Sequence, residues 1–258
     1  MPHFLPVRFE FSLLRSLRYK YNGTASKVTV PTSATIDGSS YQLRTIDAKA
    51  FSGNQHIQEV IISEGITSIG NYAFENCATL SSVTIASSVT KLSSGAFRNC
   101  TNLTAVTING DLDDCSSYST STYDNRSANY SVFYNTGTNV DSFSVTLGSS
   151  VTRIPAYLFA TAYAKSDSVY PHITSISIAD SVKEIGNYAF YACYDLSLVS
   201  IGSGVTSIGE RAFSYDISIA EITLPNKLTT IHEYAFLDCT SLQSITVPSS
   251  VTKLVSDK

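Results

Sequence analysis

The sequence has little of what membrane-spanning or nucleic-acid-binding proteins need. Its 258 residues include no tryptophan and one methionine, and only 15% of them are charged. None of its apolar runs approaches the roughly 18 to 20 residues that cross a bilayer, so no segment is expected to span a membrane. The 17 basic and 21 acidic side chains give a net charge of −4. Because non-specific phosphate binding needs a basic excess, a nucleic-acid partner is not expected.

Motifs of catalysis and metal binding are also missing. The sequence contains no GxSxG elbow, no P-loop and no GxGxxG after a strand pattern, and its four histidines have no HxxxH spacing. Asp111, Asp113 and Asp114 form an acidic cluster without the spacing of a calcium-binding EF-hand loop. We interpret this cluster as a solvated turn. The sequence therefore predicts a protein that is not an enzyme and uses neither cofactor nor metal.

What the sequence does contain is a repeat of 23 residues. Ala-Phe pairs recur at this interval at residues 50–51, 73–74 and 96–97, and again at 189–190, 212–213 and 235–236. Phe133 and Phe159 mark two degenerate copies between them. A unit of this length cannot bury its apolar side chains alone, whereas stacked units form a continuous core. The period therefore predicts a repeat solenoid.

Each unit contains a strand pattern that ends 12 residues before its phenylalanine. Val83 and Ile85 alternate with Ser82 and Thr84, as in a strand with one buried face. The pattern recurs through residues 221–224 and 244–247, and a second short extended phrase follows it. The interval leaves room for the crossover that parallel strands require. We predict a parallel β-sheet on one face and short helical or 3₁₀ turns elsewhere, with positive φ at Gly70, Gly186 and Gly209.

The segment IGNYAFENCATLSSVTIASSVTKL, residues 69–92, resembles the repeat of the BspA-like leucine-rich repeat family. The consensus of that family reads SIGxxAFxxCxxLxxVxIPxSVT, and the resemblance covers residues 25–256. It implies a right-handed leucine-rich-repeat β/α superhelix. It also implies a cell-surface or secreted protein of bacteria or protozoan parasites, where several members are adhesins for host matrix proteins or other microbes.

The chain divides into two parts on this basis. Residues 1–24 match no repeat, contain no recognisable signal peptide and form an N-terminal segment or cap. Residues 25–258 form one leucine-rich-repeat domain of about eight units, with insertions at 110–130 and 160–172. The last unit stops before its phenylalanine, which indicates either a fragment of a longer protein or self-association through an uncapped end.

Two regions are candidates for partner binding. The insertions carry tyrosines among small polar residues, a composition typical of adaptable recognition surfaces, although decorative loops are the alternative. The outward strand positions form a near-neutral hydroxyl face, although threonine is also simply a good strand former. The candidates in the insertions are Tyr118, Tyr123, Arg126, Tyr130, Tyr163 and Tyr170, and those on the sheet face are Glu59, Thr84, Thr107, Thr146, Ser177, Glu221 and Thr223.

Two structural ladders are also expected. One position, three residues after the repeat phenylalanine, is occupied by cysteine in four units and by Asn54, Thr136, Ala162 or Asp216 in the others. A position that accepts these residue types is typical of a turn with backbone hydrogen bonds, so we expect free buried thiols instead of disulfides or metal ligands. Cys115, in the first insertion, is expected to be the exposed thiol. The two ladders comprise Cys77, Cys100, Cys193 and Cys239, and Phe51, Phe74, Phe97, Phe190, Phe213 and Phe236.

These observations favour a module that mediates protein–protein or host-matrix adhesion. Its partner would be a protein or a glycan bound through the sheet face and the tyrosine-rich insertion. The alternative is a structural spacer without binding activity of its own. A hydrolase or metal-dependent enzyme ranks last, because the faces of solenoids rarely form a convergent polar pocket.

Overall fold

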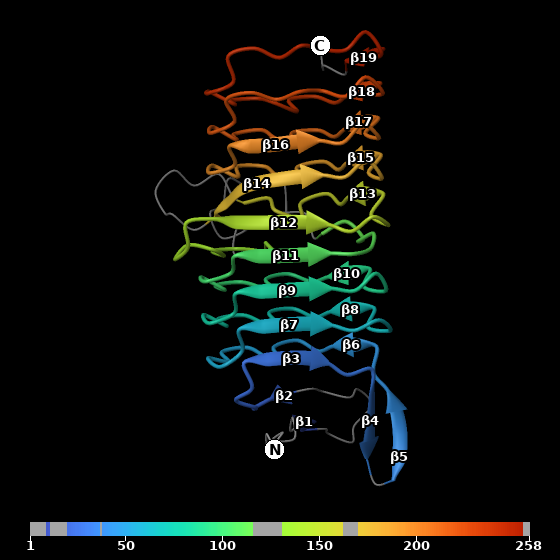
Figure 1. The fold of residues 1–258 in the computed structure, drawn as a ribbon, viewed down its shortest axis with the longest axis vertical. Helices are drawn as coiled ribbons and strands as arrows, with labels where there is room; N and C mark the ends of the chain where they lie inside the picture. The colour runs from blue at the N-terminus through green and yellow to red at the C-terminus, as the bar shows by residue number, and fades with distance from the viewer. Residues whose placement is uncertain (1–8, 11–19, 37, 116–130, 162–169, 255–258) are drawn as a thin grey trace, which may run out of the picture.

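The protein forms a stack of short parallel strands (Figure 1). The computed structural model describes residues 9–10, 20–36, 38–115, 131–161 and 170–254. The main sheet has seven strands, which lie in chain order. Residues aligned across the regular strands are 23 apart, as Glu59, Ser82 and Ala105 are. The strands are β3 (Lys27–Val30), β7 (Glu59–Ile62), β9 (Ser82–Ile85), β11 (Ala105–Ile108), β12 (Phe143–Leu147), β14 (Ile173–Ile178) and β16 (Leu198–Ile201).

The second extended phrase of each unit forms parallel strands of two residues on another side of the stack (Figure 1). These strands make a sheet of three and a sheet of five, separated by the coil that carries the first insertion. The first sheet contains β6 (Thr45–Ile46), β8 (Ser68–Ile69) and β10 (Lys91–Leu92). The second contains β13 (Arg153–Ile154), β15 (Glu184–Ile185), β17 (Ser207–Ile208), β18 (Thr230–Ile231) and β19 (Lys253–Leu254).

Two antiparallel pairs lie at the N-terminal end of the stack. β1 (Phe9–Glu10) pairs with β2 (Lys20–Tyr21), and β4 (Ser33–Ile36) pairs with β5 (Ser39–Gln42). The β4–β5 hairpin interrupts the first repeat and was not predicted. An Asp-Gly pair flanked by alternating residues, here residues 37–38, is the sequence signal that marks such a hairpin.

The expectation of helical or 3₁₀ turns is wrong, because the described residues contain no helix and therefore none that could cross a bilayer. The residues two before and two after Phe74, Tyr72 and Asn76, have φ of 57° and 59°. Tyr188 and Ala192 repeat this arrangement around Phe190. A right-handed helix cannot include left-handed residues. The backbone instead bonds to the next coil, as Phe74 N does to Ala96 O at 2.7 Å.

The repeat glycines have a different role from the predicted one. Gly70, Gly186 and Gly209 do not adopt positive φ. A β-carbon at Gly70 would lie 2.7 Å from the backbone nitrogen of Ala48 on the preceding coil, and one at Gly209 would lie 2.6 Å from that of Asn187. Glycine is therefore required because neighbouring coils approach closely.

Stacked phenylalanine rings run through the core of the stack. Each ring packs on the ring of the next unit, with centroids 4.7 to 5.6 Å apart and interplanar angles of 25° or less. Such pairs contribute about 0.5–1.5 kcal/mol beyond the burial of their area. The stacked rings are those of Phe51, Phe74, Phe97, Phe133, Phe159, Phe190, Phe213 and Phe236.

The main sheet ends at β16, although the sequence predicts further strands at residues 221–224 and 244–247. No backbone hydrogen bond between described residues joins 197–201 to 220–224. In an earlier unit the residue after the strand donates its N–H to the preceding coil, as Asn109 does to Ile85 O at 3.1 Å. Pro225 and Pro248 occupy this position and have no N–H to donate. The second sheet continues through β19, so the C-terminal coils stay joined on that side.

Candidate partner-binding surface

The outward face of the main sheet aligns side chains in rows across the strands. Strand alternation buries Val83 and Val106 and turns Thr84 and Thr107 toward solvent. Since neighbouring strands lie about 4.8 Å apart, each row presents one side chain at that interval. One row contains Glu59, Ser82, Ala105, Ser144, Ser175 and Leu198, and the other contains Ile61, Thr84, Thr107, Thr146, Ser177 and Ser200.

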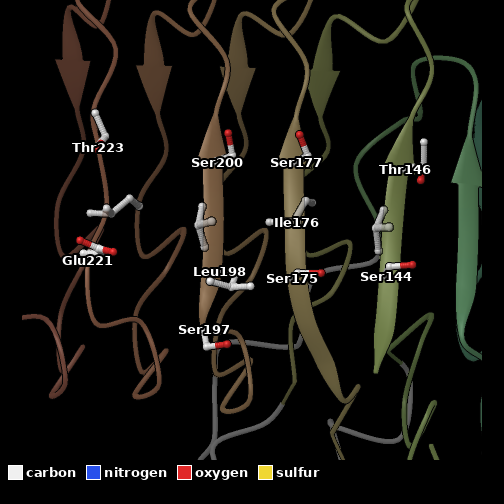
Figure 2. Close-up of a pocket in the computed structure, with 13 residues that line it drawn as sticks. Ser144, Thr146, Ser175, Ile176, Ser177, Ser197, Leu198, Ser200, Glu221 and Thr223 are labelled. Atoms are coloured by element: carbon white, nitrogen blue, oxygen red, sulfur yellow. The ribbon is translucent and has the colours of Figure 1, made fainter. Parts of the chain in front are cut away.

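A hollow of about 590 Å³ lies on this face over β12, β14, β16 and residues 221–223 (Figure 2). It brings together four predicted residues, Thr146, Ser177, Glu221 and Thr223, whereas Glu59, Thr84 and Thr107 lie on the same face outside it. The outward side chains that line it are mostly hydroxyls. They can offer many weak hydrogen bonds to a partner.

Leu198 is the large apolar side chain of the hollow, and 68% of its surface is exposed. Figure 2 shows it on the same face as Ser175 and Ser200. The sequence pattern placed Leu198 outward without identifying it as a binding residue. Its signal is a leucine in a row that otherwise contains serine, alanine and glutamate.

The two acidic residues of the face differ in their surroundings. Glu59 lies on β7, near the N-terminal end of the main sheet, and its Oε1 forms an ion pair with Lys27 Nζ at 2.9 Å. Glu221 has no ion-pair partner among the described residues. It is also the single charged residue among those that line the hollow. The hollow therefore carries one uncompensated negative charge.

Most candidates in the insertions, namely Tyr118, Tyr123, Arg126, Tyr130 and Tyr163, lie outside the described residues. The borders of the insertions are described and lie on neighbouring coils. Ser131 Oγ, directly after the first insertion, donates to Ala160 O, the first residue of the second, at 2.6 Å. Cys115 N, in the described part of the first insertion, donates to Ala156 O at 3.0 Å. The described borders of the two insertions therefore lie on adjacent coils.

Tyr170 is described, and it belongs to an aromatic cluster. Its ring stacks on His172 with centroids 4.6 Å apart and meets Tyr194 edge to face at 5.0 Å. His172 Nδ1 lies 2.8 Å from Asp195 Oδ2. Burial and the neighbouring Asp195 carboxylate raise the pKa of Tyr170. Its ring therefore supports the end of the second insertion and is only partly available to a partner.

Asp113 and Asp114 are exposed, as expected for a solvated turn, and Asp111 and Asp114 in addition anchor the start of the first insertion. Asp111 Oδ1 accepts the backbone N–H groups of Thr152 at 2.6 Å and Arg153 at 3.2 Å. Asp114 accepts the N–H of Ala156 at 3.0 Å and pairs with the Arg153 guanidinium. No group of His, Cys, Asp or Glu in the described part of the chain has the arrangement of a metal site.

The thiols of the cysteines in the repeat position donate hydrogen bonds to carbonyl groups of the preceding coil. Cys77 Sγ lies 3.1 Å from Phe51 O, and Cys100 Sγ lies 3.2 Å from Phe74 O. All five cysteines are free and buried. The expectation that Cys115 is exposed is wrong, because it is 5% exposed and packs in the core. Burial raises the pKa of Cys77 and of Cys115 to about 12.

Asp216 occupies the same position in its unit and is a carboxyl group in the core. It has no exposed surface, and its Oδ1 accepts the N–H of Cys193 at 2.8 Å. Its Oδ2 has no hydrogen-bond partner among the described residues. Burial raises the pKa of Asp216 well above its ordinary value, and the hydrogen bond from Cys193 offsets only part of this effect.

A family model described as the BspA type leucine-rich repeat region matches the chain in six copies, over residues 31–165 and 167–257. Proteins built from leucine-rich repeats are generally binding scaffolds that present an extended surface. None of the curated proteins compared with the chain matches its sequence.

Solved structures of leucine-rich repeat proteins resemble the chain at low sequence identity. A leucine-rich repeat protein from T. pallidum is 19% identical, with a TM-score of 0.48, over 92% of this chain and 87% of its own. A leucine-rich cell surface protein from Faecalibacterium prausnitzii is 21% identical, with a TM-score of 0.33, over 96% and 92%. A leucine-rich repeat protein from Bacteroides ovatus is 18% identical, with a TM-score of 0.33, over 99% and 91%.

Proposed function

Because the chain belongs to the BspA-type leucine-rich repeat family, we propose that it is a cell-surface or secreted binding module for a protein or glycan of a host matrix or another microbe. In this proposal residues 25–258 form one domain, a right-handed solenoid of 23-residue units. The outward strand faces of these units then make one continuous surface. The partner binds there, and the tyrosine-rich insertions add contacts on adjacent coils of the stack.

The observation that carries this proposal is the hollow on the sheet face. Four residues selected from the sequence, Thr146, Ser177, Glu221 and Thr223, line it together with the exposed Leu198. A partner that covers the hollow would bury the exposed leucine and meet hydroxyls that can form hydrogen bonds around it, an arrangement that a spacer does not need. An exposed row of hydroxyls alone would suit a spacer equally well.

Binding of the purified chain to a panel of matrix proteins and glycans tests the proposal. Ser177→Arg fills the hollow with a long charged side chain. Thr45→Arg places the same side chain on an exposed position of the three-stranded sheet, away from the main sheet, and is the matched control. A third variant lacks residues 116–129, and circular dichroism checks that all variants fold.

We expect Ser177→Arg to reduce binding and Thr45→Arg to leave it unchanged. Loss of binding on deletion of 116–129 alone would assign recognition to the first insertion. If every variant folds and the parent binds nothing on the panel, the adhesion proposal fails and a structural spacer is the better description.

A further inference from the structure

We propose that Leu198 and Glu221 form the centre of the binding surface and that they recognise a protein segment with a lysine or arginine beside an aliphatic side chain. This inference rests on the proposed function and specifies its partner. It goes beyond a general hydroxyl face, because it assigns recognition to the two outward side chains of the hollow that are not hydroxyls.

The position of Leu198 supplies the apolar half of the site. It aligns with Ser175 on β14, and with Ser144 one strand further. Its neighbours on β14 and along β16 are therefore small and polar, and 68% of its surface is exposed among the described residues. Burial of this side chain by a partner would be favourable, and the small polar neighbours would form the rim of the contact.

The position of Glu221 supplies the charged half. It lies beside Leu198 in the hollow (Figure 2), on the coil that follows β16. Lys27 neutralises Glu59 at the other end of the sheet, whereas no described cation neutralises Glu221. A cation from a partner would complete a charge-assisted contact there, and the bound partner would strengthen it by excluding water.

β16 is an edge strand of the main sheet and has a strand partner on one side only. Inward residues of the earlier strands, such as Val83 and Val106, are buried, but Val199 and Ile201 on β16 are half-buried. The missing backbone bonds between β16 and residues 221–224 account for this exposure. An aliphatic side chain that enters beside Leu198 therefore reaches additional apolar surface, and Glu221 can shift without breaking a ladder hydrogen bond.

The composition of the hollow distinguishes a protein segment from other partners. None of the residues that line it is aromatic, so no ring is available to stack on a sugar. Its single charge is negative, which repels phosphate groups. A basic side chain next to an aliphatic one complements both Glu221 and Leu198.

Selection of short random peptides on the purified chain tests this assignment. The recovered peptides are measured by fluorescence polarisation against the parent, Glu221→Gln and Leu198→Ser. Glu59→Gln is the matched control, because it removes an acidic charge from the same face at an exposed, compensated position. Thermal melts followed by circular dichroism establish that each variant is folded.

We expect recovered peptides to share a lysine or arginine beside Leu, Ile or Val. Each of Glu221→Gln and Leu198→Ser should weaken their binding about tenfold or more, and Glu59→Gln less than about twofold. Binding to the parent should weaken as salt rises, and binding to Glu221→Gln should depend less on salt.

The inference and the proposed function fail in different ways. Peptides that bind both variants as well as the parent, but lose binding with Ser177→Arg, would overturn the Leu198–Glu221 assignment and leave the sheet face as the binding surface. Peptides that no substitution on the sheet face affects would overturn both. If no peptide is recovered while a glycan binds the parent, the protein-segment assignment is wrong and the adhesion proposal stands.

Discussion

Asp216 gives the stability of this protein a pH dependence that a single substitution should remove. The carboxyl group is fully buried, and within the described part of the chain only one of its oxygens has a hydrogen-bond partner, the N–H of Cys193. The titratable groups coupled to it are the thiols of Cys193 and Cys239 on the neighbouring coils, and neither can supply a positive charge. The neutral acid is therefore favoured in the folded protein, and burial raises the pKa of Asp216.

The sign of the effect follows from proton binding in the two states. An acid with a raised folded-state pKa holds its proton in the folded protein at a pH where the unfolded chain has released it. The free energy of unfolding therefore falls as pH rises above about 3.9, the ordinary aspartate value. The fall is about 1.4 kcal/mol per pH unit and ends where the pH passes the folded-state pKa of Asp216.

Two variants separate the causes. Asp216→Asn keeps an oxygen that can accept from Cys193 and leaves its other polar atom unsatisfied, so it removes only the ionisation. Asp216→Cys restores the residue of the repeat, whose thiol donates to the preceding phenylalanine carbonyl in other units, as Cys239 does to Phe213 O at 3.0 Å. It should also remove the cost of the unsatisfied oxygen, about 1–3 kcal/mol.

Urea denaturation between pH 4 and pH 8, followed by circular dichroism, measures the difference between each variant and the parent. The advantage of Asp216→Asn over the parent should grow with pH, and Asp216→Cys should be the more stable of the two variants. Other titrating groups are common to all three proteins and cancel in the comparison. Parallel profiles of the parent and Asp216→Asn across this range would refute the buried, protonated carboxyl.

Three further predictions concern the stack itself. Phe97→Ala should reduce the free energy of unfolding by about 3–5 kcal/mol, because its buried ring is packed on both sides. Phe236→Ala removes a half-buried ring and should reduce it by less. Equal reductions for the two variants in urea denaturation would contradict the packing. Gly209→Ala should reduce the free energy of unfolding by about 1–3 kcal/mol, since a β-carbon would lie 2.6 Å from the Asn187 backbone. An unchanged melting temperature would contradict the close approach of the two coils. All five thiols should react with Ellman's reagent only as fast as the protein unfolds, because each is buried. Rapid labelling of any one thiol in the native protein would be inconsistent with its buried position.

The strand face of the stack could be predicted because two independent patterns agree there. In residues 82–85 and 105–108 the alternation of apolar and hydroxyl side chains assigns the inward residues, and the 23-residue period aligns the strands. Together these fix the register and therefore the rows of outward side chains. The same agreement identified Thr146 and Ser177 as neighbours on one surface before their positions in the hollow were known.

The turns could be predicted from residue types only in part. Of the left-handed positions around the repeat phenylalanines, those at Asn76, Asn99 and Asn135 hold a residue that favours positive φ, whereas those at Tyr72, Tyr188, Ala192 and Arg211 do not. Hydrogen bonds to the next coil stabilise these positions, as Tyr72 N does with Ser94 O at 3.0 Å. A pattern within one unit gives no information about such bonds, because their partners belong to another unit.

The end of the main sheet after β16 had a sequence signal that counting repeats overlooks. The apolar pattern of residues 221–224 continues the period, and Ile222 and Leu224 are indeed buried. A strand also needs its backbone donors, and Pro225 removes one at the position where Asn109 bonds to Ile85 O. The hydrophobic pattern therefore predicts which side chains face the core, whereas the proline decides whether the backbone joins the sheet.

The length of the first insertion can be counted from the sequence, but the count does not show which residues depart from the repeat. Counting from Ile108 to Phe133 assigned the whole of 110–130, including Cys115, to a solvent-exposed segment. In the structure Leu112 and Cys115 are buried, and Asp113 N donates to Thr90 O at 2.6 Å, so residues 110–115 continue the coil. The residues that depart from the repeat begin only after Cys115. Since the carboxylates of Asp111 and Asp114 bond across to Thr152 and Ala156, the acidic cluster stabilises the last regular part of this coil and positions the start of the insertion beside the sheet.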